Sequence, residues 1–262
     1  MTRYALVTGA SSGIGLAMAE ALARRGHDLI LVSRQRDRLE SIALEFTQRF
    51  GVEVLFRACD LGEPLRLSGF LLELEDSGRH IDLLVNCAGI GNSGPFMAQE
   101  WAQEQDLLDL NVVALARLCH TVGNLMAVQG GGRILNVAST MAFQPGPWMS
   151  NYAASKAFVL HLSEGLREEL RKTGVKVSVL CPGPTHTEFF RTAQLKANRM
   201  AGNRHMMTPE EVALYAVRAL DRDRTVIIPG WRNRLLSFAP RLVGRWLTRK
   251  LWSVAIRAMT TH

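Results

Sequence analysis

Cysteine and proline are scarce in this chain of 262 residues, with four and nine copies, and charged residues make up only 21% of it. With 47% hydrophobic residues beside them, these figures exclude a disordered or fibrous protein. No two cysteines are close in the sequence, which excludes a CxxC zinc knuckle or redox pair. We interpret all four as reduced thiols of the core, because each stands in apolar surroundings. They are Cys59, Cys87, Cys119 and Cys181.

Long apolar runs and targeting signals are also lacking. No uninterrupted apolar run approaches the roughly 18 residues of a membrane-spanning helix. The chain enters its first apolar segment at Tyr4 without the charged region and cleavage site of a signal peptide, so we expect a cytoplasmic protein. The seven histidines show no ligand spacing, and we predict no metal.

Acidic residues are nearly absent from residues 222–262, which hold nine of the 31 Lys and Arg but one of the 24 acids, Asp223. The other residues hold 22 basic and 23 acidic groups, so the net charge of +7 comes from the C-terminal segment. The rest of the chain therefore has no excess of basic residues, and the sequence has no zinc finger, basic zipper or RNP motif. We predict no nucleic-acid partner.

Apolar segments of strand length alternate with amphipathic stretches along the chain. This alternation predicts an α/β fold: one Rossmann-like, doubly wound parallel sheet of about seven strands with helices on both faces. The expected strands are 3–8, 28–33, 52–58, 81–85, 132–138, 175–181 and 225–228. The expected helices are near 13–25, 36–50, 64–78, 100–128, 151–173 and 209–221.

No linker or repeat divides the chain. We predict one nucleotide-binding and catalytic domain over residues 1–228, in which 184–208 is a loop that covers the substrate. Residues 229–262 follow as a basic amphipathic helical extension.

A glycine-rich turn, Thr8-Gly9-Ala10-Ser11-Ser12-Gly13-Ile14-Gly15, joins the first strand to the first helix. Glycines let the backbone approach a pyrophosphate, and the amides and dipole of the helix N-terminus face its negative charge. Ser11 and Ser12 add hydroxyl donors. The alternative is a glycine turn that only packs strand on helix.

The second strand ends at Arg34, where a protein that binds NAD(H) usually has a carboxylate for the ribose 2′-hydroxyl. Arg36 and Arg38 follow. A guanidinium at this point pairs with a 2′-phosphate, which favours NADP(H) over NAD(H). An ordinary solvated, basic helix start is the alternative.

Tyr152 and Lys156 stand four residues apart at the start of an expected helix, and therefore on one face of it. A neighbouring ammonium favours phenolate, so we expect a pKa for Tyr152 below its usual value of about 10. Ser139 follows the fifth strand and can donate to an oxygen bound at the same sheet edge. Such a tyrosine can act as a general acid.

Taken in order, these features resemble the classical short-chain dehydrogenase/reductase family from about residue 4 to residue 228. The motifs that carry the resemblance are Thr8-Gly9-x3-Gly13-x-Gly15, Asp60-Leu61, Asn86-Cys87-Ala88-Gly89, Asn111, Ser139, Tyr152-x3-Lys156 and Pro182-Gly183. Several independent motifs in the right order leave little room for chance. Cys87 departs from the family, which usually has a second Asn there, and we expect a difference in packing only.

The resemblance implies a role for each residue. Tyr152 would be the general acid/base, Lys156 would lower the Tyr152 pKa and bind the nicotinamide ribose, and Ser139 would hydrogen-bond the substrate oxygen. Asn111 would hold a water that passes protons on. The implied cofactor contacts are Asp60 and Leu61 at the adenine, Asn86, Ala88 and Gly89 along the adenosine ribose, and Pro182, Gly183 and Thr187 at the nicotinamide carboxamide.

The substrate side and the tail leave alternatives open. Apolar residues of 184–208 and of Met141–Met149 suggest a mostly apolar pocket, or else they pack the loop down. A basic amphipathic helix is expected over 241–258. It could pack on the body or a second subunit, contact a membrane peripherally, or form a lid or docking site for an acidic carrier or CoA-linked substrate.

These observations predict an NADP(H)-dependent oxidoreductase that interconverts a moderately apolar ketone or aldehyde and its alcohol. A non-catalytic nicotinamide sensor or scaffold, and a membrane-associated reductase of lipid-derived ketones, are the alternatives. The resemblance also implies a homodimer or homotetramer through 100–128 and 151–173.

Overall fold

The structure, a computed structural model, describes residues 3–189, 193 and 206–257. Seven parallel strands form one sheet in the order β3-β2-β1-β4-β5-β6-β7. The strands are β1 (Arg3–Thr8), β2 (Asp28–Ser33), β3 (Val54–Ala58), β4 (His80–Asn86), β5 (Gly132–Val137), β6 (Val175–Leu180) and β7 (Val226–Ile227). The predicted doubly wound sheet is confirmed. Its switch point lies between β1 and β4, where such sheets bind ligands.

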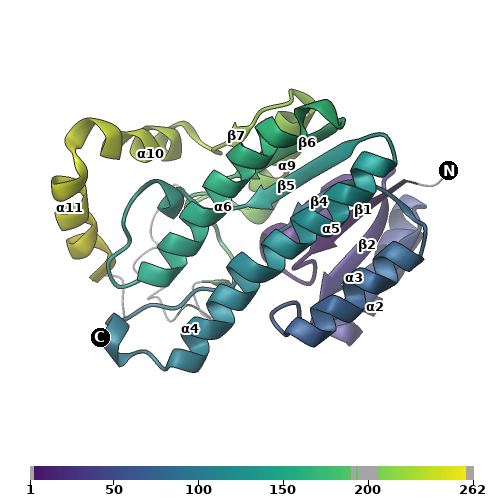
Figure 1. Ribbon diagram of the computed structural model, residues 1–262, viewed down its shortest axis with the longest axis horizontal. Helices are drawn as coiled ribbons and strands as arrows, with labels where there is room; N and C mark the ends of the chain where they lie inside the picture. Colours follow the sequence, from purple (N-terminus) through teal and green to yellow (C-terminus); the bar gives the residue numbers. More distant parts are fainter. Residues whose placement is uncertain (1–2, 190–192, 194–205, 258–262) are drawn as a thin grey trace.

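Helices cover both faces of the sheet (Figure 1). One layer contains α1 (Gly13–Ala23), α2 (Arg36–Phe50) and α9 (Pro209–Asp221). The other contains α3 (Pro64–Asp76), α5 (Leu115–Val128) and α6 (Ser150–Glu169). The described residues also form η1 (Phe96–Ala98), α4 (Trp101–Leu108), the π-helical turn η2 (Asp109–Ala114), η3 (Thr140–Phe143), η4 (Leu170–Lys172), α10 (Trp231–Val243) and α11 (Arg245–Arg257).

The two layers follow from the period of two along each strand. In β1, Leu6 packs into the core on the α3–α5–α6 side, and its neighbour Val7 packs into the core on the α1–α2–α9 side. Both side chains are fully buried. Strands covered on both faces therefore read as continuous apolar runs, which is what made them recognisable in the sequence.

One helical run, Trp101–Val128, is long and apolar enough to cross a membrane by length and composition, with a mean hydropathy of 1.2 in its most apolar window. It is not the uninterrupted apolar run sought in the sequence, because Asp109, Asn111 and Arg117 stand within it. The core helices of proteins without a membrane span pass the same test, and 44% of the window is buried. Its α5 portion packs against β4 and β5, so the run is weak evidence for a membrane span.

The C-terminal extension is helical, and α11 lies within the range 241–258 where a helix was expected. It forms two helices, because Gly244 has a φ of +82° and ends α10 before α11 begins at Arg245. Figure 1 shows this pair, in yellow, at the end of the molecule away from the N-terminus. The predicted loop 184–208 lies largely outside the described residues, as do its Phe190, Leu195 and Met200.

Candidate active site

A cavity of about 640 Å³ opens at the carboxyl ends of the strands, beside the switch point. Its volume lies in the range of small-molecule sites. Most of the residues predicted from the sequence line it. They are Gly9, Ser11, Ser12, Gly13, Ile14, Gly15, Arg34, Asp60, Leu61, Ala88, Gly89, Ser139, Tyr152, Lys156, Pro182, Gly183 and Thr187. Asn86 and Asn111 are not among the residues that line it.

The glycine turn forms one wall of the cavity. Gly9 has a φ of +67°, and a Cβ there would lie 2.9 Å from the Ala88 backbone, so only glycine fits this crossing. Helix α1 begins at Gly13, and the amides of its first turn have no partner within the helix. The turn can therefore receive an anion.

Thr8, at the end of β1, fixes the opposite wall. Its buried Oγ1 accepts hydrogen bonds from the backbone N–H groups of Cys87 (3.0 Å) and Ala88 (3.1 Å). This contact holds the segment after β4 against the glycine turn. Thr8 is the first residue of the glycine motif. The sequence did not show that its side chain links the end of β1 to the segment after β4.

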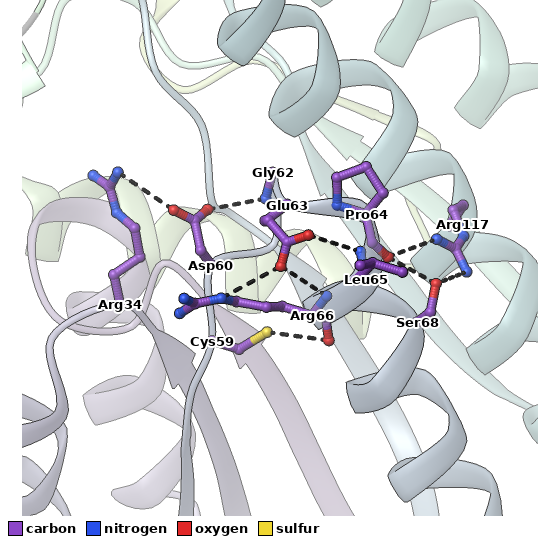
Figure 2. Close-up of polar contacts among 10 residues, drawn as sticks. All are labelled: Arg34, Cys59, Asp60, Gly62, Glu63, Pro64, Leu65, Arg66, Ser68 and Arg117. Carbon is purple, nitrogen blue, oxygen red and sulfur yellow. Dashed lines mark hydrogen bonds and ion pairs between the residues drawn. The ribbon is translucent and has the colours of Figure 1, made fainter.

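The far end of the cavity carries the charged groups Arg34 and Asp60, shown in Figure 2. Arg34 Nη1 lies 3.9 Å from Asp60 Oδ2, and the arginine side chain is 69% exposed. Asp60 Oδ1 accepts a hydrogen bond from the Gly62 N–H at 3.1 Å. Arg36 lies over the Phe56 ring at 5.9 Å from its centroid and does not line the cavity. Arg34 is therefore the guanidinium of this group that faces the cavity.

Helix α6 presents Tyr152 and Lys156 at the opposite end. Both are buried, and Lys156 Nζ lies 5.8 Å from the centroid of the Tyr152 ring. The ammonium donates a hydrogen bond to the Val137 carbonyl at 3.1 Å. Ser139 follows β5 and lines the same cavity, where it lowers the pKa of Tyr152. Three of the four residues predicted to be catalytic, Ser139, Tyr152 and Lys156, thus line the same cavity.

Burial governs the ionisation of this pair. It raises the pKa of Tyr152 to about 12, an effect that hydrogen bonding to Ser139 reduces. It lowers the pKa of Lys156 to about 8, because burial disfavours the ammonium. The direction for Tyr152 is opposite to the lowered pKa expected from the sequence, since desolvation outweighs the stabilisation of the phenolate.

Asn111 sits in the π-helical turn η2, an irregularity typical of functional sites. Its Oδ1 accepts from the Ile90 N–H at 3.0 Å, and its Nδ2 donates to the Ile90 carbonyl at 2.9 Å. Nδ2 also lies 3.2 Å from Ser155 Oγ. Asn111 therefore stands behind the cavity wall and anchors the segment after β4 to α6. Its predicted role in holding a water stays a prediction.

The Asn86 side chain points away from the cavity, and its predicted contact with the adenosine ribose stays a prediction. Its Nδ2 donates to Asn136 Oδ1 at 2.9 Å and lies 3.3 Å from Cys119 Sγ, while Asn136 Nδ2 donates to Ser163 Oγ at 3.0 Å. The reason is strand alternation: Asn86 pairs with Asn136 in register, and both face α5 and α6. Cys87, one residue on, lines the cavity instead.

The substrate end of the cavity is apolar. Its wall includes Ile90, Met141, Met149, Phe189 and Trp252. Met141, Met149 and Phe189 fall in segments from which an apolar pocket was predicted, whereas Phe143, Pro145 and Pro147 do not line it. The Phe189 and Tyr152 ring centroids are 5.2 Å apart, which places this wall beside the reacting groups.

Trp252 of α11 was missed as a cavity residue by the sequence analysis. It packs on the small cluster that contains Met149 and Tyr152. Arg257 secures the same helix, because its guanidinium lies 5.5 Å from the centroid of the Trp148 ring. No sequence signal pointed to Trp252, since its place depends on the path of the whole extension.

Residues 3–198 match the family model described as short chain dehydrogenase. A short-chain dehydrogenase from Sphingobium yanoikuyae, solved in complex with NADPH, is 37% identical with a TM-score of 0.83, over 93% of this chain and 94% of that one. A bulky-bulky ketone specific alcohol dehydrogenase from Comamonas testosteroni is 33% identical with a TM-score of 0.78, over 93% of each chain.

A curated relative has a named activity as well. The 7beta-hydroxysteroid dehydrogenase of Collinsella aerofaciens is 28% identical over 88% of this chain and 87% of its own. The family model covers well over half of the chain, and a solved short-chain dehydrogenase shares the fold. The chain therefore belongs to the classical short-chain dehydrogenase/reductase family.

Proposed function

We propose that this oxidoreductase uses NADP(H) to interconvert a carbonyl compound and its alcohol by hydride transfer, with Tyr152 as the general acid/base. The observation that carries the proposal is the meeting of Ser139, Tyr152 and Lys156 in the same cavity as the glycine turn. Family membership supports the oxidation and reduction of carbonyls and alcohols. Similar proteins that bind NADPH or act on ketones support the finer assignment.

The residues present fit a nicotinamide dinucleotide. The backbone crossing at Gly9 leaves no room for a side chain, and the first turn of α1 faces the cavity. The glycine turn would hold the pyrophosphate, and Thr187 and the Pro182–Gly183 segment would hold the nicotinamide end. When bound, the dinucleotide supplies or accepts the hydride.

The preference for NADP(H) rests on Arg34. Its guanidinium lines the end of the cavity nearest Asp60, and it is held there by one long ion pair of 3.9 Å. A 2′-phosphate would be a stronger partner, because it offers a full charge and several acceptor oxygens. Asp60, also at this end, would accept from the adenine or its ribose rather than approach the phosphate.

Tyr152 is suited to deliver a proton. With a pKa raised to about 12 it is a phenol at neutral pH, and its Oη can donate to a carbonyl oxygen beside Ser139. Ser139 would donate a second hydrogen bond to the same oxygen. Lys156, with its pKa lowered to about 8, still carries a proton at neutral pH and would stabilise the phenolate left behind.

The substrate class follows from the apolar wall. Met141, Met149, Phe189 and Trp252 surround the space next to Tyr152. Such a chamber gains free energy by burying apolar groups and offers little to a highly polar molecule. We therefore assign a moderately apolar ketone, aldehyde or secondary alcohol as substrate.

Replacement of Tyr152 by phenylalanine tests the mechanism. We expect Tyr152→Phe to bind NADPH as the unmodified protein does, measured by nucleotide fluorescence, and to lose about 100-fold or more in turnover of a panel of ketones. Tyr215→Phe is the matched control, because Tyr215 lies on α9 outside the cavity. Near-normal turnover by Tyr152→Phe would remove Tyr152 from the mechanism.

The assembly and location are also proposals. We propose a homodimer or homotetramer in the cytoplasm, paired through α5, α6 and the adjoining η2 turn. Exposed apolar side chains on this side support it, with Val113 46% and Phe158 38% exposed. Light scattering at micromolar concentration tests the assembly, and a monomer mass would contradict it.

A further inference from the structure

The helix α10 is oriented with apolar side chains toward solvent. Trp231 and Leu235, one turn apart, are 71% and 62% exposed. The inner face carries the polar residues Asn233 and Ser237 instead. Asn233 packs so closely on Gly183 that a Cβ there would overlap it, and Ser237 is only 2% exposed. A surface helix in water normally shows the opposite arrangement.

The next helix repeats this pattern. Leu247, Leu251 and Val254 of α11 follow the spacing of one helix face and are 41%, 60% and 73% exposed. Thr248 is 5% exposed, and Trp252 reaches the cavity wall. The inner face is thus largely buried, while the apolar outer face is left in contact with water.

We define the outer face of the extension by six residues, all exposed: Trp231, Leu235, Trp246, Leu247, Leu251 and Val254. Its charge is of one sign. No acidic residue occurs after Asp223 in the sequence, and Arg232, Arg234, Arg249 and Lys250 are exposed on the same two helices. Tryptophan, leucine and arginine together are typical of helices that lie in the interface of a bilayer.

A second copy of this chain or a lipid surface could cover such a face, and the charge of the face favours one of them. In a symmetric dimer the same patch meets itself, so the basic groups of one copy would face those of the other. An anionic lipid surface supplies both apolar depth and opposite charge. Figure 1 shows the two helices at one end of the molecule, outside the main helix layers, where a planar surface can reach them.

We propose that the outer face of the extension binds an anionic phospholipid bilayer peripherally. The helices lie in the plane of the lipid headgroups, with Leu247, Leu251 and Val254 inserted among the first acyl carbons and the arginines at the phosphates. This inference goes beyond the proposed catalysis and does not depend on it. Trp252, on the inner side of α11, stays at the cavity.

Vesicle co-sedimentation of the full chain tests the proposal. We expect binding to phosphatidylcholine vesicles that contain about 30% phosphatidylglycerol, about tenfold or more weaker binding to phosphatidylcholine alone, and a loss of binding as salt rises from about 0.05 to 0.5 M. Equal binding to both vesicles, or binding to neither, would overturn the proposal.

Two pairs of substitutions locate the contact. We expect Leu251→Ser with Val254→Ser, and separately Arg249→Gln with Lys250→Gln, to weaken binding to the anionic vesicles about tenfold or more. The matched control is Leu65→Ser with Leu72→Ser on α3, which removes side chains 81% and 59% exposed elsewhere. Unchanged binding in both tail variants, or an equal loss in the control, would overturn the assignment.

Light scattering tests whether a second copy covers this face, and activity tests whether the substitutions disturb the cavity. If the protein is a dimer that Leu251→Ser with Val254→Ser converts to a monomer, a second copy covers this face and the proposal is wrong. Turnover of a water-soluble ketone should be unchanged in the tail variants, because none of the changed residues lines the cavity. An inactive protein that binds anionic vesicles would refute the catalytic proposal alone.

Discussion

Replacing the buried Lys156 by methionine should make the protein more stable while it abolishes catalysis. Burial lowers the pKa of Lys156 from 10.5 to about 8, and a change of one in pKa corresponds to about 1.4 kcal/mol. The buried charge therefore costs about 3 kcal/mol at pH 7. The substitution also removes the hydrogen bond from Nζ to the Val137 carbonyl, 3.1 Å long, at a loss of about 1 kcal/mol. The net expected gain is about 2 kcal/mol.

The pH dependence identifies the cause. The pKa of Lys156 is lower in the folded than in the unfolded protein, so the unfolded chain binds the proton more tightly. The cost is complete below about pH 8 and fades as the pH rises toward 10.5, so the unmodified protein gains stability in that window. The advantage of Lys156→Met should therefore fall to about 1 kcal/mol at pH 9.

Urea unfolding followed by circular dichroism, at pH 7 and pH 9 and without added nucleotide, measures both values. Lys172→Met is the matched control. Lys172 is exposed, so its removal should change the free energy of unfolding by less than about 0.5 kcal/mol at either pH. A Lys156→Met protein that is less stable at pH 7, or equally favoured at both pH values, would refute the reasoning.

The remaining predictions concern cofactor choice, substrate choice and the core. Arg34→Asp should weaken NADPH binding about tenfold or more and leave NADH binding nearly unchanged in a fluorescence titration; equal losses would argue against a 2′-phosphate contact. Trp252→Ala should lower kcat/KM for bulky aryl ketones about tenfold more than for small ones, whereas Trp246→Ala, on the outer face, should change neither. Asn136→Ala should cost about 1 to 3 kcal/mol in urea unfolding, because it removes the oxygen acceptor of Asn86 Nδ2 and leaves only the weak acceptor Cys119 Sγ; a neutral result would mean that the amide relaxes.

The strands and helices of the body followed closely from local patterns. Apolar runs such as Leu29 to Val32 gave the strands, since a strand covered on both faces has no polar alternation. In the structure Pro64 stands at the beginning of α3, and Gly51, in the left-handed region at a φ of +70°, caps the end of α2. These signals depend on a few neighbouring residues and not on tertiary contacts.

The extension was harder to predict for a physical reason. Apolar residues at helical spacing normally indicate a buried face, yet Leu247 and Leu251 point to solvent. The break at Gly244 depends on a left-handed φ that glycine permits but does not require. Pro240, inside α10, also reads as a helix breaker.

The positions of site residues were predictable where they lie on one helix, and less so where they depend on the packing of several elements. The four-residue spacing of Tyr152 and Lys156 placed both on one helix face, as the structure has them. The direction of the Tyr152 pKa was wrong, because it depends on how much protein surrounds the phenol, and spacing does not report that. The Asn86 side chain turns away from the side of its neighbour Cys87 because of strand alternation, which the motif by itself does not report.

Trp252 and Leu251 are adjacent in sequence but lie on different sides of α11. Substituting each one separately therefore tests both proposed roles of this helix. Successive residues of an α-helix are turned by about 100°. Trp252 therefore reaches the cavity, while Leu251 lies 60% exposed on the outer face. If the helix keeps its position, Trp252→Ala changes substrate selectivity and leaves vesicle binding intact, and Leu251→Ser does the reverse. A change in both properties from either substitution would mean that α11 shifts as a unit, and the two surfaces would then have to be treated as one.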